Sequence, residues 1–339
     1  MIVDLRSDTL TKPCSVMRTV MAKAEVGDDV FGEDPTVCEL ESYLAELAGH
    51  EAGLFCASGT QSNLVALLSH CQRGDEYIVG QNAHTYRYEA GGAAVLGSIQ
   101  PQPLEHESDG SICLHKIQAS IKADDFHFAK SRLLALENTI GGKVLPMSYL
   151  RQAKTLATSN NLQFHLDGAR VFNAAVAINK PVSEITGLFD SVSICLSKGL
   201  GCPVGSVLVG TRDLIEEARR WRKMVGGGMR QAGMLAAAGL YALKNNVASL
   251  KNDHERAQVI ASSICDIPGL SVRDGGAQTN MIFLEVDPER SDLFLKACKE
   301  QGVLFTGHGI LRLVVHRDID DQGVTHAVNI ISSNASKLL

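Results

Sequence analysis

The hydrophobic positions of this chain follow two alternating spacings over its first two thirds. Short apolar runs, typical of buried strands, occur at 53–56, 77–79, 133–136, 164–166, 192–196 and 204–209. Helical spacing lies between several of these runs. It begins after Asp34 and Pro35, a pair typical of a helix start, and recurs at 146–159. This alternation predicts an α/β fold with a mainly parallel, mixed sheet between helices.

The pattern changes near residue 247. Two helices, at 213–224 and 230–245, close the first part of the chain. A helix, strands at 270–272 and 281–286, a helix at 291–301, a strand at 311–315 and a final helix follow. This order is typical of a small α+β domain. We therefore expect a large domain over residues 1–247, including an N-terminal arm, and a small C-terminal domain over residues 248–339.

Composition narrows the class of protein. The 339 residues are 45% hydrophobic with a net charge of −6, so we expect a large core and no nucleic-acid or membrane partner. The first ten residues carry three charges and no apolar run, which argues against a secretory signal. Nine scattered cysteines without CxxC spacing argue against a zinc site or a disulfide framework. We expect reduced thiols in a cytoplasmic protein without a bound metal.

The first candidate for chemistry is the turn formed by Ser58, Gly59 and Thr60, which lies between a predicted strand and a predicted helix. A glycine lets a ligand approach the backbone, and a helix N-terminus offers free N–H groups to a phosphate. An ordinary turn with a capping hydroxyl has the same appearance. Neither GxGxxG nor GxxxxGK[ST] occurs, so this turn does not indicate a dinucleotide site or a P-loop.

Two further candidates stand at strand ends. Asp167 ends an apolar strand and Lys198 ends the next one, where Gly199, Gly201 and Pro203 force a tight turn. Ligands of open α/β sheets bind beside the carboxyl ends of the strands. A partly desolvated lysine can form a Schiff base, and a carboxylate can pair with a protonated pyridine nitrogen. A local salt bridge of Asp167 and a surface position of Lys198 are the plainer alternatives.

Together the three segments match the needs of pyridoxal 5′-phosphate (PLP). This cofactor requires an anchor for its phosphate, a carboxylate that keeps the ring nitrogen protonated, and an amine for its aldehyde. The combination favours PLP over each plainer alternative.

The chain resembles the low-specificity L-threonine aldolases, PLP enzymes of the aspartate-aminotransferase-like fold type. The resemblance covers nearly the whole length, and its order and spacing are highly specific. It is carried by the following strings: Asp4-Leu-Arg-Ser-Asp-Thr9, Gly27-Asp-Asp-Val-Phe-Gly-Glu-Asp-Pro35, Ser58-Gly-Thr-Gln-Ser-Asn63, His84, Glu89-Ala-Gly-Gly92, Glu137-Asn-Thr139, His165-Leu-Asp-Gly-Ala-Arg170, Leu196-Ser-Lys-Gly-Leu-Gly201 and Gly226-Gly-Gly-Met-Arg-Gln231.

The resemblance implies a role for each matching residue. It makes Lys198 the Schiff-base lysine, Asp167 the partner of the pyridine nitrogen, and His84 the residue stacked on the ring. The remaining implied roles are the phosphate site (Ser58, Gly59, Thr60 and Arg230), the clamp for the substrate carboxylate (Ser7, Arg170 and Arg312) and a second histidine near the substrate hydroxyl (His127). Many relatives have a histidine after Glu-Asn-Thr, where this chain has Ile140.

The implied reaction is retro-aldol cleavage of L-threonine or L-allo-threonine to glycine and acetaldehyde. The β-hydroxyl must lose a proton to a base of moderate pKa, and His84 and His127 are the candidates. The resemblance implies a PLP-dependent transferase-like large domain and a homo-oligomer with its site between subunits. A β-eliminating lyase or a phenylserine-type aldolase would use the same lysine and clamp. A non-catalytic PLP-binding scaffold is the contrasting class.

Overall fold

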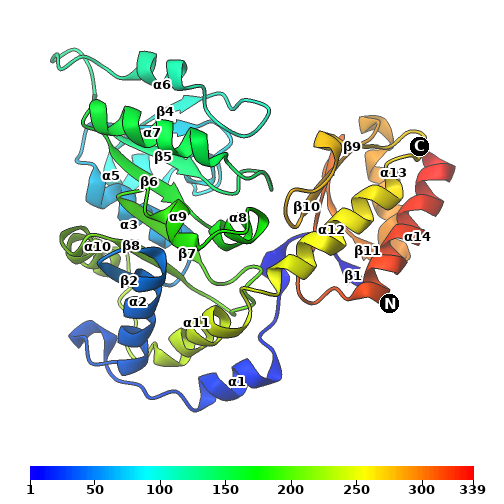
Figure 1. Ribbon diagram of the computed structural model, residues 1–339, viewed down its shortest axis with the longest axis horizontal. Helices are drawn as coiled ribbons and strands as arrows, with labels where there is room; N and C mark the ends of the chain where they lie inside the picture. Colours follow the sequence, from blue (N-terminus) through cyan, green and yellow to red (C-terminus); the bar gives the residue numbers. More distant parts are fainter.

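A computed structural model describes all 339 residues, and Figure 1 shows two bodies connected by the N-terminal segment and by α12 (Leu250–Ile264). A seven-stranded sheet forms the centre of the larger body. Its strands follow the order β2 (Ala52–Cys56), β8 (Ser206–Gly210), β7 (Ser191–Cys195), β6 (Gln163–Asp167), β5 (Lys130–Glu137), β3 (Asp75–Gly80) and β4 (Gln100–Leu104). β8 runs antiparallel to both of its neighbours, and the other pairs are parallel. The α/β prediction with a mixed, mostly parallel sheet is confirmed.

Helices cover both faces of this sheet. Leu134 and Leu136 of β5 belong to the core that includes Leu150 of α7 (Met147–Ser159). Leu133 and Ala135 point to the opposite face and belong to a separate core with Leu67 of α3 (Gly59–His70), as expected from the alternation of side chains along a strand. The sheet is therefore buried on both sides.

The other helices and 3-10 helices complete the larger body. They are η1 (Asp8–Leu10), α1 (Ser15–Ala22), η2 (Asp29–Phe31), α2 (Pro35–Ala48), α4 (His84–Arg87), α5 (Gly92–Gly97), α6 (Leu114–Ser120), α8 (Val171–Ala177), α9 (Val182–Thr186), α10 (Arg212–Met224) and α11 (Gly233–Asn245).

The smaller body has its own core. A four-stranded antiparallel sheet follows the order β12 (Thr306–His308), β13 (Ile310–Val314), β10 (Met281–Glu285) and β9 (Ser271–Val272). The other elements are α12, η3 (Arg273–Gly275), α13 (Pro288–Glu300), β11 (Val303–Leu304) and α14 (Asp321–Leu338). Val3 and Leu5 are buried in this core because β1 (Val3–Asp4) pairs with β11. The start of the chain therefore packs with its C-terminal residues.

None of the helices combines the length and the apolar character that crossing a membrane would require.

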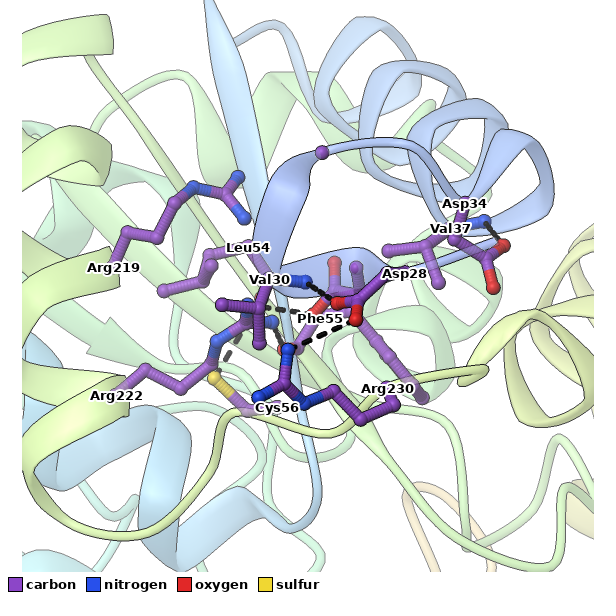
Figure 2. Close-up of polar contacts among 12 residues, drawn as sticks. Asp28, Val30, Asp34, Val37, Leu54, Phe55, Cys56, Arg219, Arg222 and Arg230 are labelled. Carbon is purple, nitrogen blue, oxygen red and sulfur yellow. Dashed lines mark hydrogen bonds and ion pairs between the residues drawn. The ribbon is translucent and has the colours of Figure 1, made fainter. Parts of the chain in front are cut away.

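Asp34 links three segments of the larger body. Its side chain caps α2 by accepting hydrogen bonds from the N–H groups of Thr36 (3.1 Å) and Val37 (3.0 Å), as Figure 2 shows in part. Its other oxygen accepts hydrogen bonds from the N–H groups of Gly27 (3.2 Å) and Gly233 (2.8 Å), which starts α11. The side chain is fully buried, so no water can replace these bonds.

Replacement of Asp34 by alanine is expected to lower the free energy of unfolding by roughly 3 kcal/mol, because a helix cap is lost and buried N–H donors lose their acceptor. Asp320 provides a matched control: it is exposed and caps α14 through Gly323 alone (2.8 Å). Asp320→Ala should lower the free energy of unfolding by only about 1 kcal/mol. Urea unfolding followed by circular dichroism measures both values, and equal losses would contradict the role given to Asp34.

Candidate active site

The chain brings its chemically active segments to one edge of the large sheet. β3, β5, β6 and β7 are parallel, and β2 shares their direction because it is antiparallel to β8, which is antiparallel to β7. Their carboxyl ends lead into Ser58, His84, Glu137, Asp167 and Lys198. An open α/β sheet binds its ligands at this edge.

The N-terminus of α3 has the features of an anion site. The Oγ of Ser58 caps the helix by accepting a hydrogen bond from the N–H of Gln61 (3.1 Å), and the N–H groups of Gly59 and Thr60 lie too early in the helix for an intrahelical acceptor. A Cβ on Gly59 would lie 3.6 Å from the Oγ of Ser206, which is buried and has no hydrogen-bond partner. An orphaned buried hydroxyl beside free N–H groups suits a phosphate.

Asp167 is a buried carboxylate held by two N–H donors. Its Oδ2 accepts a hydrogen bond from the amide of Asn63 (2.9 Å), and its Oδ1 accepts one from the backbone of Ala169 (3.0 Å). The residue is 3% exposed. Hydrogen bonds of this kind favour the charged form of a carboxylate, which is the form that a protonated pyridine nitrogen requires.

His84 contacts two carboxylates at the start of α4. Its ring Nδ1 lies 2.8 Å from Glu89, and its backbone N–H donates to Glu137 (2.8 Å). The hydrogen bond to Glu89 raises the pKa of His84 despite partial burial. Burial raises the pKa of Glu89, and burial beside Asp167 raises that of Glu137. Because Glu89 accepts from Nδ1–H, the lone pair of His84 is on Nε2.

Lys198 lies in the loop of the hairpin between β7 and β8. Gly201 and Gly205 have φ angles of 80° and 104° in this loop, values that other residues rarely adopt. The backbone carbonyl of Lys198 accepts hydrogen bonds from Gly201 (2.8 Å) and from the Oγ1 of Thr11 (2.9 Å). The loop is therefore tied to the N-terminal segment, and the lysine side chain is half-buried.

Arg170 forms a bidentate ion pair with Asp8 from the N-terminal segment. Its Nε and Nη2 donate to the two carboxylate oxygens at 2.7 and 2.6 Å, and Asn280 donates to the same carboxylate (3.2 Å). Burial alone would raise the pKa of Asp8, but the charge and hydrogen bonds of Arg170, together with Lys198 and Asn280, outweigh burial and lower the pKa. Nη1 makes no hydrogen bond within the protein, so one side of the guanidinium remains for a ligand.

Arg312, on β13, lines a cavity together with Arg170. Its Nη2 donates to the backbone carbonyl of Arg6 (3.0 Å), and its Nε is a buried donor without a partner. The cavity has a volume of about 1200 Å³ and includes His84, Glu137, Arg170 and Arg312 among its lining residues. Ser7 precedes Asp8 and caps η1, where its Oγ accepts from the N–H of Thr9 (3.2 Å). The expected clamp residues therefore belong to two bodies of the structure.

Two expected site residues lie apart from these groups within one chain. His127 is exposed in the loop between α6 and β5, where its ring contacts Asp125 (2.6 Å). Arg230 is exposed and pairs with Asp28 (2.9 Å), as Figure 2 shows. Arg222 lies next to Arg230 in that view but is buried, and it pairs with Asp29 (2.7 Å).

Three side chains with clear positions in the site had no role assigned from the sequence. They are Asn63, Glu89 and Glu137, all of which stand in the strings that carry the resemblance. A polar residue in the helical stretch after Thr60 was the available signal for Asn63, because that helix covers the sheet and its buried residues, apart from Ser62 and Asn63, are apolar. Which carboxylate meets which histidine depends on loop geometry, which residue spacing does not encode.

The residues present fit PLP. The orphaned hydroxyl of Ser206 and the free N–H groups of α3 suit its phosphate, Asp167 suits its ring nitrogen, and Lys198 supplies an amine at the same sheet edge. A ring nitrogen of His84 and carboxylate oxygens of Glu89 and Asp167 lie within 4.8 Å of one another, so these polar groups converge on one place.

Solved structures share this fold. Threonine aldolase from Leishmania major has a TM-score of 0.83 at 18% identity, with 97% of this chain and 98% of that chain covered. A putative L-allo-threonine aldolase from Listeria monocytogenes has a TM-score of 0.81 at 19% identity, covering 98% and 97%.

Sequence relatives are closer. The low specificity L-threonine aldolase of Escherichia coli K12 is 55% identical over 94% of this chain and 95% of its own length. The probable low-specificity L-threonine aldolase 2 of Arabidopsis thaliana is 44% identical over 96% and 95%. A family profile described as beta-eliminating lyase matches residues 4–287. This chain therefore belongs to the beta-eliminating lyase family and, within it, to the low-specificity L-threonine aldolases.

Proposed function

We propose that the chain is a PLP-dependent carbon–carbon lyase that cleaves L-threonine, L-allo-threonine and other β-hydroxy-α-amino acids to glycine and an aldehyde. The observation that carries the proposal is the position of Lys198, Asp167 and His84 after the carboxyl ends of parallel strands of one sheet, in a chain 55% identical to an L-threonine aldolase. When bound, PLP supplies an electron sink for the density left on Cα when the Cα–Cβ bond breaks.

The residues of the sheet edge divide the binding of the cofactor among them. The N-terminus of α3 would hold the phosphate through Gly59 and Thr60, with the hydroxyl of Ser58 keeping the helix end in place. Asp167 would hold a proton on the ring nitrogen, and the Nζ of Lys198 would bind the cofactor covalently. Arg230 belongs to the proposed phosphate site by resemblance. Within one chain its side chain pairs with Asp28, so it would have to leave Asp28 to contact the phosphate.

The two arginines of the cavity would orient the substrate carboxylate. Arg170 retains its Nη1, and Arg312 retains a buried Nε without a partner. Two fixed cations around one carboxylate define the rotation about the N–Cα bond and hence which bond of Cα breaks. Ser7, beside Asp8, completes the proposed clamp.

We propose His84 rather than His127 as the base for the substrate hydroxyl within one chain. The Nε2 of His84 has a free lone pair because Glu89 occupies Nδ1–H, and His84 lines the cavity. His127 is 67% exposed in its side chain and points to Asp125, so it would reach a substrate only across a subunit contact.

A β-eliminating lyase is the second candidate, favoured by the description of the matching family. It would use the same lysine and clamp on an amino acid with a leaving group at Cβ. Product analysis with L-threonine, L-phenylserine and O-acetyl-L-serine separates the activities, because an aldehyde and pyruvate are distinguishable products.

We also propose a homo-oligomer located in the cytoplasm. Large apolar side chains are exposed on three separate segments: Phe31 (73%), Phe126 (93%) and Met224 (72%). A contact between subunits would remove such side chains from water. The cytoplasmic location rests on the spacing of the cysteines, which is typical of reduced thiols.

Lys198→Ala should abolish the release of acetaldehyde from L-threonine, since no other amine takes its place at the sheet edge. Borohydride reduction of the PLP-loaded protein followed by peptide mapping should label the peptide with Lys198 and no other. Lys180→Ala, which removes an exposed lysine paired with Glu184 (3.4 Å), is the control and should retain full activity. A label elsewhere, or wild-type protein with PLP that releases no aldehyde, would refute the proposal.

Glu89→Gln should move the acid limb of the kcat–pH profile to lower pH. The hydrogen bond to Glu89 raises the pKa of His84, so wild-type activity is lost as pH falls through that raised value. An uncharged glutamine lowers the pKa of His84 and keeps the base neutral at lower pH. Glu105→Gln, at an exposed glutamate, serves as the control. An unchanged acid limb in Glu89→Gln would exclude His84 as the base.

Sedimentation velocity of the PLP-loaded protein should show a species of two or four chains, and activity should follow that species on dilution. Phe126→Asp would weaken the association if the loop around His127 lies in a subunit contact, because a charge would be buried there. A fully active species with the mass of one chain would contradict the oligomer.

A further inference from the structure

A continuous chain of hydrogen bonds runs from the end of α3 to Asp167. The ring Nε2 of His70 lies 2.7 Å from the Oγ of Ser191, which lies 2.7 Å from the Nδ1 of His165. The Nε2 of His165 lies 3.3 Å from the Oδ1 of Asn63. The amide nitrogen of Asn63 then donates to Asp167 (2.9 Å). Five side chains from α3, β6 and β7 are therefore connected.

The geometry of the sheet produces this alignment. His165 and Ser191 are register partners on the parallel strands β6 and β7, so their side chains lie next to each other on one face. Asp167 stands two residues after His165 and therefore points to the same face, toward α3. His165 and Ser191 are fully buried, and Asn63 is 2% exposed.

The carboxylates of Asp167 and Glu89 fix which group donates in every hydrogen bond of this series. The amide nitrogen of Asn63 donates to both Asp167 and Glu89 (2.8 Å), so its oxygen must face His165. His165 then carries its proton on Nε2 and accepts at Nδ1 from the hydroxyl of Ser191. That hydroxyl has one proton, so His70 must donate to its oxygen through Nε2–H. All donors point toward the carboxylates.

Both imidazoles are neutral in this arrangement. Burial lowers the pKa of His165 to about 3 and that of His70 to about 4. A neutral ring with one N–H and one lone pair can pass a hydrogen bond onward, whereas an imidazolium would face the hydroxyl of Ser191 with a second donor. The chain therefore has one donor order at neutral pH.

We propose that His70, Ser191 and His165 are positioning residues that act through Asn63 on Asp167, fixing its orientation and favouring its charge toward the ring nitrogen of PLP. The aligned dipoles place the positive end of each bond toward the carboxylate, and bonds in such a series strengthen one another. The proposal rests on the proposed function, because Asp167 is taken as the partner of the ring nitrogen.

His70, the outer end of the hydrogen-bond series, lies near the surface. His70 is half-buried and lines a separate cavity of about 620 Å³, together with Ser69, Cys71 and Arg132. A substitution at His70 therefore removes the first donor of the hydrogen-bond series without opening a cavity in the core, and provides a mild test.

The first test is ¹⁵N NMR of the histidine side chains in the protein prepared without PLP. Between pH 6 and 8, His165 and His70 should both show the neutral form with the proton on Nε2. In Ser191→Ala, the shift of Nδ1 of His165 should move because its donor is lost. A proton on Nδ1 of His165, or a charged ring at pH 7, would overturn the proposal. This result does not depend on catalysis, so it is separable from a failure of the proposed function.

The second test compares Ser191→Ala with Ser69→Ala in the PLP-loaded enzyme. Ser69 lies one residue before His70 and donates only to the carbonyl of Val65 (2.7 Å), so its variant should keep wild-type kinetics. Ser191→Ala should lower kcat roughly tenfold with KM unchanged, a loss equivalent to one hydrogen bond in the transition state. An unchanged kcat with a lower unfolding midpoint would assign the chain to stability alone and contradict the proposal.

His70 carries the test if Ser191→Ala does not fold. His70→Leu removes the donor to Ser191, and His70→Gln restores an N–H at a similar distance from Cα. We expect a lower kcat in His70→Leu and recovery of most of it in His70→Gln. Equal kcat values in the two variants would contradict the proposal. Absence of aldehyde release from the wild-type enzyme would instead refute the proposed function.

Discussion

The site depends on satisfying one carboxylate with hydrogen bonds inside a buried sheet edge. Asp167 is almost fully buried, and a carboxylate in such a place must receive hydrogen bonds or take up a proton. Two N–H donors, from Asn63 and Ala169, meet this demand. The β6 strand, the turn after it and helix α3 must all be in place for these donors to converge, so fold and chemistry are coupled at this residue.

Charge balance around the cavity follows the same logic. Four carboxylates, those of Asp8, Glu89, Glu137 and Asp167, lie on or near a space lined by Arg170 and Arg312. Asp8 is neutralised by the bidentate pair with Arg170, and Glu89 accepts hydrogen bonds from His84 and Asn63. Burial raises the pKa of Glu137. A site arranged in this way leaves guanidinium groups available for an incoming carboxylate and a neutral nitrogen available for a hydroxyl proton.

The sequence predicted the architecture well where periodicity is strong. The strands of the central sheet other than β4, and α2 with its Asp34 cap, follow the hydrophobic pattern closely. β4 was not predicted, because its Gln100-Pro-Gln-Pro-Leu104 lacks an apolar run, and its place at the sheet edge is what tolerates two prolines. The pairing of Val3 with Val303 was also missed, since long-range pairing of a two-residue strand leaves no local signal.

The site was predicted in part. Asp167 and Lys198 stand at strand ends, which is a signal that residue order carries. The bidentate pair of Arg170 with Asp8 and the hydrogen-bond chain through His165 arise from contacts between segments distant in sequence, and spacing does not encode them. His127 instead contacts Asp125, two residues earlier, in an exposed loop. A crystal structure of the PLP-loaded protein tests the central claim most directly. The account predicts the ring nitrogen about 3 Å from a carboxylate oxygen of Asp167, with continuous density from the cofactor to the Nζ of Lys198. A ring nitrogen that faces solvent or another side chain would contradict it.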